Sequence, residues 1–243
     1  VNSPESPIFQ KGKLIYHLND AKLAIRRHNR VVLLEGFLDV ISAVEAGFVE
    51  SVATMGTALT EDHSRELRRL TDQIILCFDG DKAGLAAANK AIPILMAQNF
   101  SVSVVEIPNK MDPDEFIKTH GKEAFSKLID QAIPAVDYQY RYIKRQFNLE
   151  FVSHREQFKR QIYHFAYTLQ SHTLQELILK KLAYDISIGE QSILQEFNSS
   201  KSQVYKNANI NNNKNENLQI HSRQVRDTKY ERSEKMLIHY MLK

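Results

Sequence analysis

Cysteine is nearly absent from this 243-residue chain, which has one cysteine and no tryptophan. A single cysteine excludes an internal disulfide framework and a zinc site built from several thiolates. That residue, Cys77, lies inside an apolar run, so we expect a buried and unreactive thiol. No apolar stretch approaches the roughly 18 residues of a membrane span, and no signal peptide opens the chain. We therefore expect a cytoplasmic protein.

Neither sign of charge dominates, because 32 lysines and arginines face 29 aspartates and glutamates, for a net charge of +3. This balance neither requires nor excludes a nucleic-acid partner, since the distribution of charge matters more than its sum. A content of 43% hydrophobic and 25% charged residues is typical of one or two ordinary domains. The chain opens at Val1 rather than at a methionine, so we expect a piece of a longer protein.

Short apolar runs alternate with helical segments in the first half of the chain. We expect strands at 31–34, 51–55, 74–78 and 102–107. We expect helices from Gly12 to about His28, at 40–46, at 60–70, and over an alanine-rich stretch ending near Gln98. Alternation of this kind predicts an α/β fold with a parallel sheet flanked by helices.

The strand signal disappears from Asp112 onward, where amphipathic helical patterns and then a polar, asparagine-rich stretch follow. We expect an all-helical subdomain beside the sheet and a flexible linker after it. The predicted divisions are 1–30, an α/β domain at 31–115, a helical subdomain at 116–197, a linker at 198–230, and a helix at 231–243 that opens a truncated domain.

The stretch 74–84 carries the strongest chemical signal, because its apolar run ends in Asp79-Gly80-Asp81. In an open α/β sheet, ligands bind in the crevice outside the carboxyl ends of the strands. Carboxylate oxygens at that place suit Mg²⁺. In an alternative interpretation, Asp79 starts a turn and Asp81 caps the helix that follows.

Further acids follow the other expected strands, and parallel strands place their carboxyl ends on one edge of the sheet. The six acids expected there are Glu35, Asp39, Asp79, Asp81, Asp112 and Asp114. So many like charges in one crevice repel strongly unless cations neutralise them. We therefore expect a divalent-metal site suited to two-metal phosphoryl chemistry. Carboxylates alone leave open whether such a site joins nucleotides or cuts a strand.

Four ordered motifs together resemble the Toprim region of bacterial replicative DNA primases of the DnaG type. They are Glu35-Gly-Phe-Leu-Asp39, Gly56-Thr-Ala-Leu-Thr60, Phe78-Asp-Gly-Asp-Lys-Ala-Gly84 and Asp112-Pro-Asp-Glu-Phe116. The segment 2–12 also resembles the lead-in to that region. A glutamate with Asp-x-Asp also occurs in topoisomerases and some nucleases, and the second and fourth motifs favour primases.

The resemblance implies a Toprim-like fold and an enzyme that makes short RNA primers on single-stranded DNA from ribonucleoside triphosphates. It implies Mg²⁺ or Mn²⁺ as cofactor, with two or more ions, and a place at the bacterial replication fork. Residues 1–30 would end the N-terminal part of the polymerase core, and 231–243 would begin a domain that binds the replicative helicase. We expect no zinc in this chain and no membrane contact.

The resemblance also assigns roles to single residues. The metal-binding positions would be Glu35, Asp79, Asp81, Asp112 and Asp114, with Asp39 as an additional acid. Glu35 and Lys11 would be catalytic. The residues that contact nucleotide or template would be Asn2, Lys11, Gly56, Thr57 and Lys82.

Two alternatives remain beside primer synthesis. One is strand cleavage by a Toprim nuclease or a topoisomerase-like enzyme, and the other is a non-catalytic scaffold that docks helicase or single-stranded DNA. Tyrosines and cations interleave between Tyr138 and Arg145 and would suit a single strand, but at helical spacing we expect the tyrosines to lie in the core.

Overall fold

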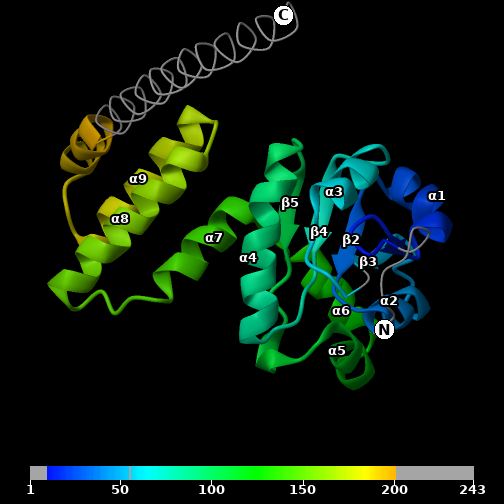
Figure 1. Ribbon diagram of the computed structural model, residues 1–243. Coiled ribbons are helices and arrows are strands. Elements are labelled where there is room, and N and C mark those ends of the chain that lie inside the picture. Colours follow the sequence, from blue (N-terminus) through cyan, green and yellow to red (C-terminus); the bar gives the residue numbers. More distant parts are fainter. Residues whose placement is uncertain (1–9, 55, 201–243) are drawn as a thin grey trace, which may run out of the picture. The chain divides into compact units, whose positions relative to one another are not determined.

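A computed structural model describes residues 10–54 and 56–200 of the chain. The chain divides into two compact units, one ending at Gln146 and the other beginning at Phe147. Figure 1 labels the elements of both. Three expectations lie outside the described residues: the contact made by Asn2, most of the polar linker, and the helix at 231–243.

The first unit contains a six-stranded sheet with the order β1-β3-β2-β4-β5-β6. The strands are β1 (Ile15–Tyr16), β2 (Val31–Leu34), β3 (Ser51–Thr54), β4 (Gln73–Leu76), β5 (Ser101–Val104) and β6 (Ile133–Pro134). The four central strands pair in parallel, which confirms the expected α/β sheet. The two edge strands pair antiparallel, so the sheet is mixed.

Both edge strands correct expectations from the sequence. The helix predicted from Gly12 begins only at Leu18, because the backbone of 15–16 pairs with the end of β3. A strand also occurs beyond Asp112, where we expected none, since β6 pairs with β5. Pro134 is tolerated there because an edge strand needs no donor on its open side.

Helices cover both faces of the sheet. One face packs against α1 (Leu18–His28), α3 (Glu61–Arg68), α4 (Lys82–Ala97) and α7 (Ala135–Lys144). The other face packs against α2 (Phe37–Glu45), α5 (Pro113–His120) and α6 (Lys122–Asp130). The short helix η1 (Pro108–Lys110) lies between β5 and α5.

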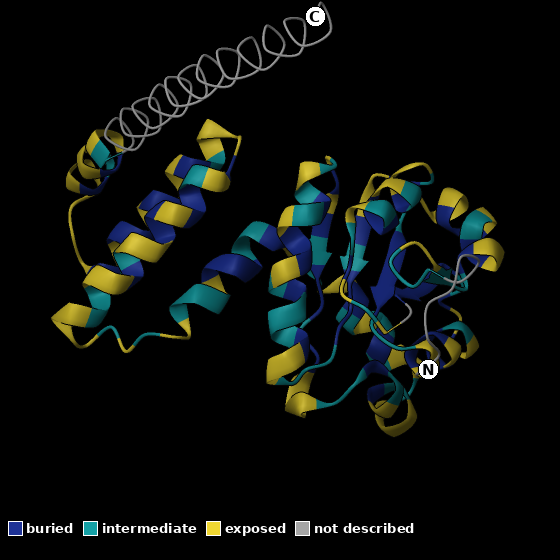
Figure 2. Ribbon diagram, in the orientation of Figure 1, coloured by how far each residue is buried: buried dark blue, intermediate teal, exposed yellow. Residues whose placement is uncertain are grey.

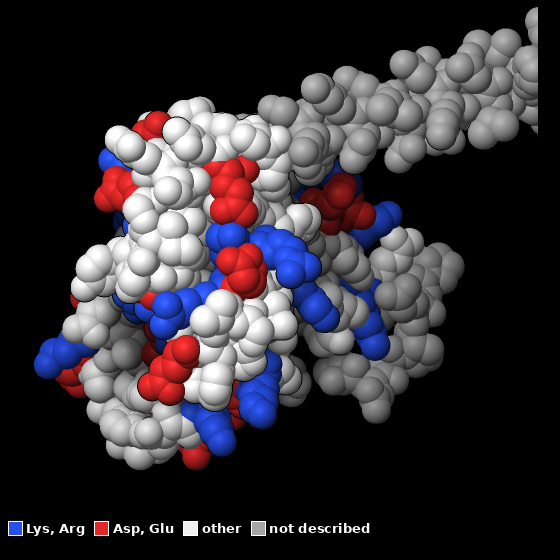
Figure 3. All heavy atoms as spheres, turned by 90° about the vertical axis from the view of Figure 1, so that its left-hand side faces the viewer, with Lys and Arg blue, Asp and Glu red and all other residues white. Residues whose placement is uncertain are grey.

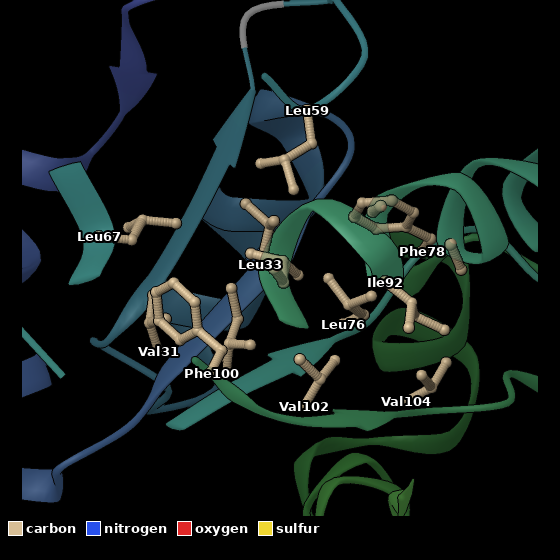
Figure 4. Packing of buried hydrophobic residues seen from close by; sticks show 14 of the residues in the cluster. Val31, Leu33, Leu59, Leu67, Leu76, Phe78, Ile92, Phe100, Val102 and Val104 are labelled. Atoms are coloured by element: carbon tan, nitrogen blue, oxygen red, sulfur yellow. The ribbon is translucent and has the colours of Figure 1, made fainter. Parts of the chain in front are cut away.

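Alternate residues of one strand enter the two cores, as the pleat of a strand requires. In β2, Val31 and Leu33 join the core under α4, while Val32 and Leu34 join the core under α2. β2 and β3 are buried at every position, and Figure 2 shows dark blue strands in the middle of the sheet. Figure 4 shows how the core under α4 packs. Cys77 belongs to the core under α2 and is fully buried, as expected. Burial raises the pKa of its thiol.

The order of the strands places a switch point beside β2. The chain leaves β2 for β3 on one side and later returns to the other side of β2 as β4. In open α/β sheets, ligands bind at such a reversal, outside the carboxyl ends of the strands. The residues that follow β2 and β4 therefore occupy the favoured position for a site.

The second unit contains α8 (Val152–Thr168) and α9 (His172–Ile186), in agreement with the helices expected there. Tyr163 of α8 donates a hydrogen bond to the carbonyl oxygen of Ile193 at 3.2 Å. On the face in Figure 3, lysines and arginines lie interspersed with acidic residues. Among the residues described, no helix combines the length and the hydropathy that crossing a membrane requires.

Candidate active site

Two carboxylates meet at the switch point, at the ends of neighbouring strands. Glu35 directly follows β2, and Asp79 lies three residues past the end of β4. The backbone N–H of Asp79 donates to Glu35 Oε1 at 3.3 Å. Both side chains lie at the carboxyl edge of the sheet, as the sequence predicted.

Glycines let two further segments approach Asp79. The N–H of Gly80 donates to the carbonyl oxygen of Met111 at 2.8 Å. A Cβ atom at Gly80 would lie 2.4 Å from the carbonyl oxygen of Ile107, and one at Gly84 would lie 2.2 Å from that of Asp79. Side chains do not fit at either position. The close approach brings the turn before Asp112 against the turn that carries Asp79.

Two of the six acids cap helices. Asp81 Oδ1 accepts from the N–H of Gly84 at 2.8 Å and caps α4. Asp112 Oδ1 accepts from the N–H of Glu115 at 2.7 Å and caps α5. The capping interpretation is therefore confirmed for Asp81, which still has a second oxygen.

Asp39 and Asp114 join α2 to α5. Asp39 accepts from the N–H of Gly36 at 3.0 Å and from the N–H of Asp114 at 3.3 Å. The Asp114 carboxylate accepts from the Ser42 hydroxyl and from Lys118 Nζ, the latter at 2.7 Å. These contacts hold the pKa of Asp114 below its usual value. Both acids thus position backbone in addition to carrying charge.

Burial and mutual repulsion shift the pKa values of Glu35, Asp39 and Asp79. Burial, followed by the charges of Asp79, Asp39 and Asp81, raises the pKa of Glu35 to about 7. Burial, opposed by its two N–H donors, raises the pKa of Asp39 to about 6. Burial and the charges of Asp112 and Asp81 raise the pKa of Asp79. Glu35, Asp39, Asp79, Asp81 and Asp112 thus lie near enough to one another for their like charges to raise the pKa of their neighbours.

The carboxylates at this edge are compatible with a hard cation. Asp79 Oδ1 is buried without a hydrogen-bond partner, and Glu35 lies beside it. Within the described ranges, no three His, Cys, Asp or Glu side chains are arranged to hold a metal ion by themselves. Mg²⁺ is often bound by only one or two carboxylates together with substrate phosphates and waters. An incomplete protein shell is therefore compatible with Mg²⁺.

A cavity of about 760 Å³ adjoins Glu35. Its walls are the loop after β3 and one face of α4, and its lining residues include Glu35, Gly56, Thr57, Leu59, Phe78, Ala83, Ala86, Ala87, Lys90 and Ile94. The volume and the mostly apolar walls are those of a small-molecule site. The predicted residues Gly56 and Thr57 thus line a cavity, and the Thr57 hydroxyl is buried without a partner.

Two lysines of α4, Lys82 and Lys90, lie in different surroundings. Lys82, named from the sequence, is exposed at the first residue of the helix. Lys90, which the sequence analysis missed, lines the cavity. Spacing along the helix was a usable signal, because residues 83, 86, 87, 90 and 94 share one helical face. Within the described part of the chain, neither Lys82 nor Lys11 forms an ion pair with the six acids.

The segment that interleaves tyrosine with cations is structural. Tyr138 and Tyr140 are each only 1% exposed. Arg141 and Arg145 form ion pairs with Glu106, the latter at 2.7 Å. The expectation that these tyrosines lie in the core is confirmed.

Comparisons with known proteins agree with this geometry. A family model described as Toprim-like matches residues 32–117. A DNA primase of Listeria monocytogenes is 36% identical over 202 residues, which cover 82% of this chain and 32% of that protein. A DNA primase of Geobacillus stearothermophilus is 38% identical over 201 residues, covering 83% and 34%. The chain thus spans about a third of the length of these relatives.

The fold is also similar to solved structures. A DnaG primase catalytic domain bound to ssDNA superimposes with a TM-score of 0.68 at 29% identity. The match covers 79% of this chain and 62% of that one.

Proposed function

This chain carries a Toprim-like domain and is a homologue of DnaG-type DNA primases over most of its length, and from that relationship we propose that it holds the nucleotidyl-transfer centre of a primase. The reaction is RNA primer synthesis from ribonucleoside triphosphates on a single-stranded DNA template. The proposal is supported above all by Asp79, which has a buried carboxylate oxygen without a partner and whose backbone N–H donates to Glu35, a residue that lines the cavity.

Toprim domains of primases are generally metal-dependent, and the residues present fit Mg²⁺ or Mn²⁺. Glu35 and Asp79 would hold a first ion, and the second carboxylate oxygens of Asp81 and Asp112 would contribute to another. Asp114 would join them by giving up its bond to Ser42 or to Lys118. Bound ions would lower the pKa of the attacking hydroxyl and stabilise charge on the attacking and leaving oxygens. Asp39 keeps α2 and α5 in place around them.

The cavity would hold the nucleotide, with its phosphates toward the acids and its nucleoside against α4. A 3′-hydroxyl oxygen attacks the α-phosphorus, the bond from that phosphorus to the bridging oxygen breaks, and pyrophosphate leaves. Where Glu35 is not itself bound to an ion, it would be a base for the hydroxyl proton, since burial beside the other acids raises its pKa to about 7 in the metal-free protein. Gly56 and Thr57 line the nucleotide side of the cavity.

The named relatives are primases rather than nucleases or topoisomerases, which favours nucleotidyl transfer over strand cleavage. The solved DnaG domain is bound to ssDNA, which supports a single-stranded template for this chain also. A replicative helicase as partner stays a proposal that rests on the resemblance.

Calorimetric titration tests the metal and nucleotide roles together. Mn²⁺ is titrated into the wild-type chain and into Asp79→Asn, first alone and then with ATP present. We expect the wild type to bind ATP only with Mn²⁺, and Asp79→Asn to lose this binding.

Asp72→Asn is the matched control, since Asp72 is exposed just before β4, at the opposite end of the strand from Asp79. It should bind Mn²⁺ and ATP as the wild type does. Equal heats for the wild type and Asp79→Asn would refute the nucleotidyl-transfer centre and favour the non-catalytic scaffold.

A further inference from the structure

A histidine occupies an unusual place at the start of α3. Thr60 is the N-cap, and the third helical residue is His63, whose Nδ1 accepts the backbone N–H of Thr60 at 3.3 Å. In a capping box this third residue is ordinarily Glu or Gln, whose side chain only has to accept that N–H. His63 is fully buried, although a cap normally sits at the surface.

The second ring nitrogen of His63 explains the difference. Nε2 lies 2.9 Å from the carbonyl oxygen of Lys11. Because Nδ1 already accepts from Thr60, the proton of a neutral imidazole resides on Nε2, which therefore donates to Lys11. A glutamate would present only acceptors to that carbonyl. Burial favours this neutral state by lowering the pKa of His63.

Thr60 makes a second link to the same segment. Its hydroxyl accepts from the N–H of His63 at 3.1 Å and donates to the carbonyl oxygen of Gly12 at 2.7 Å. Two consecutive carbonyls, those of Lys11 and Gly12, are thus bound by two side chains of α3. The turn around them is closed by the N–H of Lys13, which donates to Gln10 at 2.9 Å.

The same links lie next to one wall of the cavity. The loop of residues 56–59 lines the cavity and ends at Thr60. Lys11 lies 52 positions from His63 in the sequence. The side chains of Thr60 and His63 therefore tie the turn at Lys11 to the start of α3, directly after this loop.

From these contacts we infer that His63 is a positioning residue of the nucleotide site. By bonding the backbone of Thr60 and of Lys11 at once, it holds the Lys11 backbone against the start of α3, next to the loop that lines the cavity, before a nucleotide arrives. The inference rests on the proposed nucleotide site and on the contact of Lys11 with nucleotide or template that the resemblance implies. His63 itself touches no substrate.

Two amide substitutions separate its two bonds. The His63→Asn side chain keeps an acceptor near Nδ1 and so keeps the cap, but it is too short to reach Lys11. The longer His63→Gln side chain has an oxygen for Thr60 and an N–H that extends toward Lys11, so it should act as the conservative rescue. Thr60→Val leaves His63 in place and removes both the bond to Gly12 and the cap bond from the N–H of His63.

Trypsin cleavage measures the anchoring directly, because cutting after Lys11 or Lys13 requires the turn to open. We expect His63→Asn to be cut there about tenfold faster than wild type, the effect of losing one hydrogen bond on local opening. Thr60→Val, which loses two, should be cut at least as fast. His63→Gln should be cut at close to the wild-type rate. Products starting at Gly12 or Leu14 are identified by mass.

Nucleotide binding measures the consequence. With Mn²⁺ present, His63→Asn should bind ATP about five- to tenfold more weakly, since Lys11 must then be ordered during binding, while its Mn²⁺ affinity stays unchanged. Lys11→Ala should weaken ATP binding similarly. The double variant should be no weaker than Lys11→Ala alone, because His63 acts through Lys11.

Other results of these two assays would refute either the anchoring of the Lys11 turn or the positioning role of His63. Unchanged trypsin rates refute the anchoring. Faster cleavage with unchanged ATP affinity, or additive losses in the double variant, refutes positioning through Lys11. A wild type that binds no ATP refutes the proposed function and with it the positioning role, while the trypsin rates still decide the anchoring separately.

Discussion

Removing the charge of Glu35 should stabilise the metal-free protein. Burial and the neighbouring acids raise the pKa of Glu35 from 4.5 to about 7. A carboxyl whose pKa is raised on folding binds more protons in the folded state, so stability falls as pH rises from about 4.5 to about 7. Glu35→Gln cannot ionise and escapes this loss. Its amide oxygen can still accept the N–H of Asp79.

The size of the effect follows from the pKa. At about 1.4 kcal/mol per pKa unit, the full rise corresponds to roughly 3 kcal/mol. Glu35 is only partly buried, so solvent screening reduces this to about 1–2 kcal/mol. For a chain of this length, that is a gain of about 3–6 °C in melting temperature. The gain should be present at pH 8 and absent at pH 4.5.

Thermal unfolding in EDTA at several pH values measures this gain. Glu45→Gln serves as control, because Glu45 is exposed in the last turn of α2, and a surface change of this kind stays within about 0.5 kcal/mol. Saturating Mn²⁺ at pH 8 should narrow the gap by stabilising the wild type. A melting temperature of Glu35→Gln that equals or falls below that of the wild type at pH 8, without metal, would refute the electrostatic reasoning.

Three further results are expected. Lys118→Met should raise the pKa of Asp114 toward its usual value, because the ion pair that lowers it is lost; carboxyl NMR titration measures this, and an unchanged pKa would contradict it. Gly80→Ala should lower the free energy of unfolding by about 1–3 kcal/mol through overpacking, since its Cβ would meet the carbonyl of Ile107; urea unfolding gives the value, and no loss would show that the turn yields. Glu50→Ala should cost about 2–3 kcal/mol in the same assay, because Glu50 is 1% exposed and pairs with Arg30, whose own partial exposure lowers the usual cost of breaking a buried pair; a loss below about 0.5 kcal/mol would place the pair with ordinary surface ion pairs.

The sequence specified the central sheet but not its edges. Runs such as Val31–Leu34 are apolar at every position, which is the pattern of a strand buried on both faces. Ile15–Tyr16 and Ile133–Pro134 are too short for any periodicity, and they become strands only because a partner backbone lies beside them. Local pattern cannot report a pairing made across the fold.

The candidate site shows the same division. Spacing and strand ends identified Glu35 and Asp79, because parallel strands bring their carboxyl ends to one edge whatever their separation in sequence. Sequence could not distinguish a carboxylate that caps a helix, such as Asp81, from one whose oxygen remains without a partner, such as Asp79. That difference depends on where the backbone N–H groups point.

The sequence by itself determined the α/β class, the acid-bearing edge and the primase-like motifs, because these depend on residue type and order. Only the tertiary structure decided that Lys90 lines the cavity and that His63 holds Lys11. Both depend on contacts between segments far apart in the chain. Such contacts form only when the chain packs, because the free energy that fixes them comes from burial shared by the whole core.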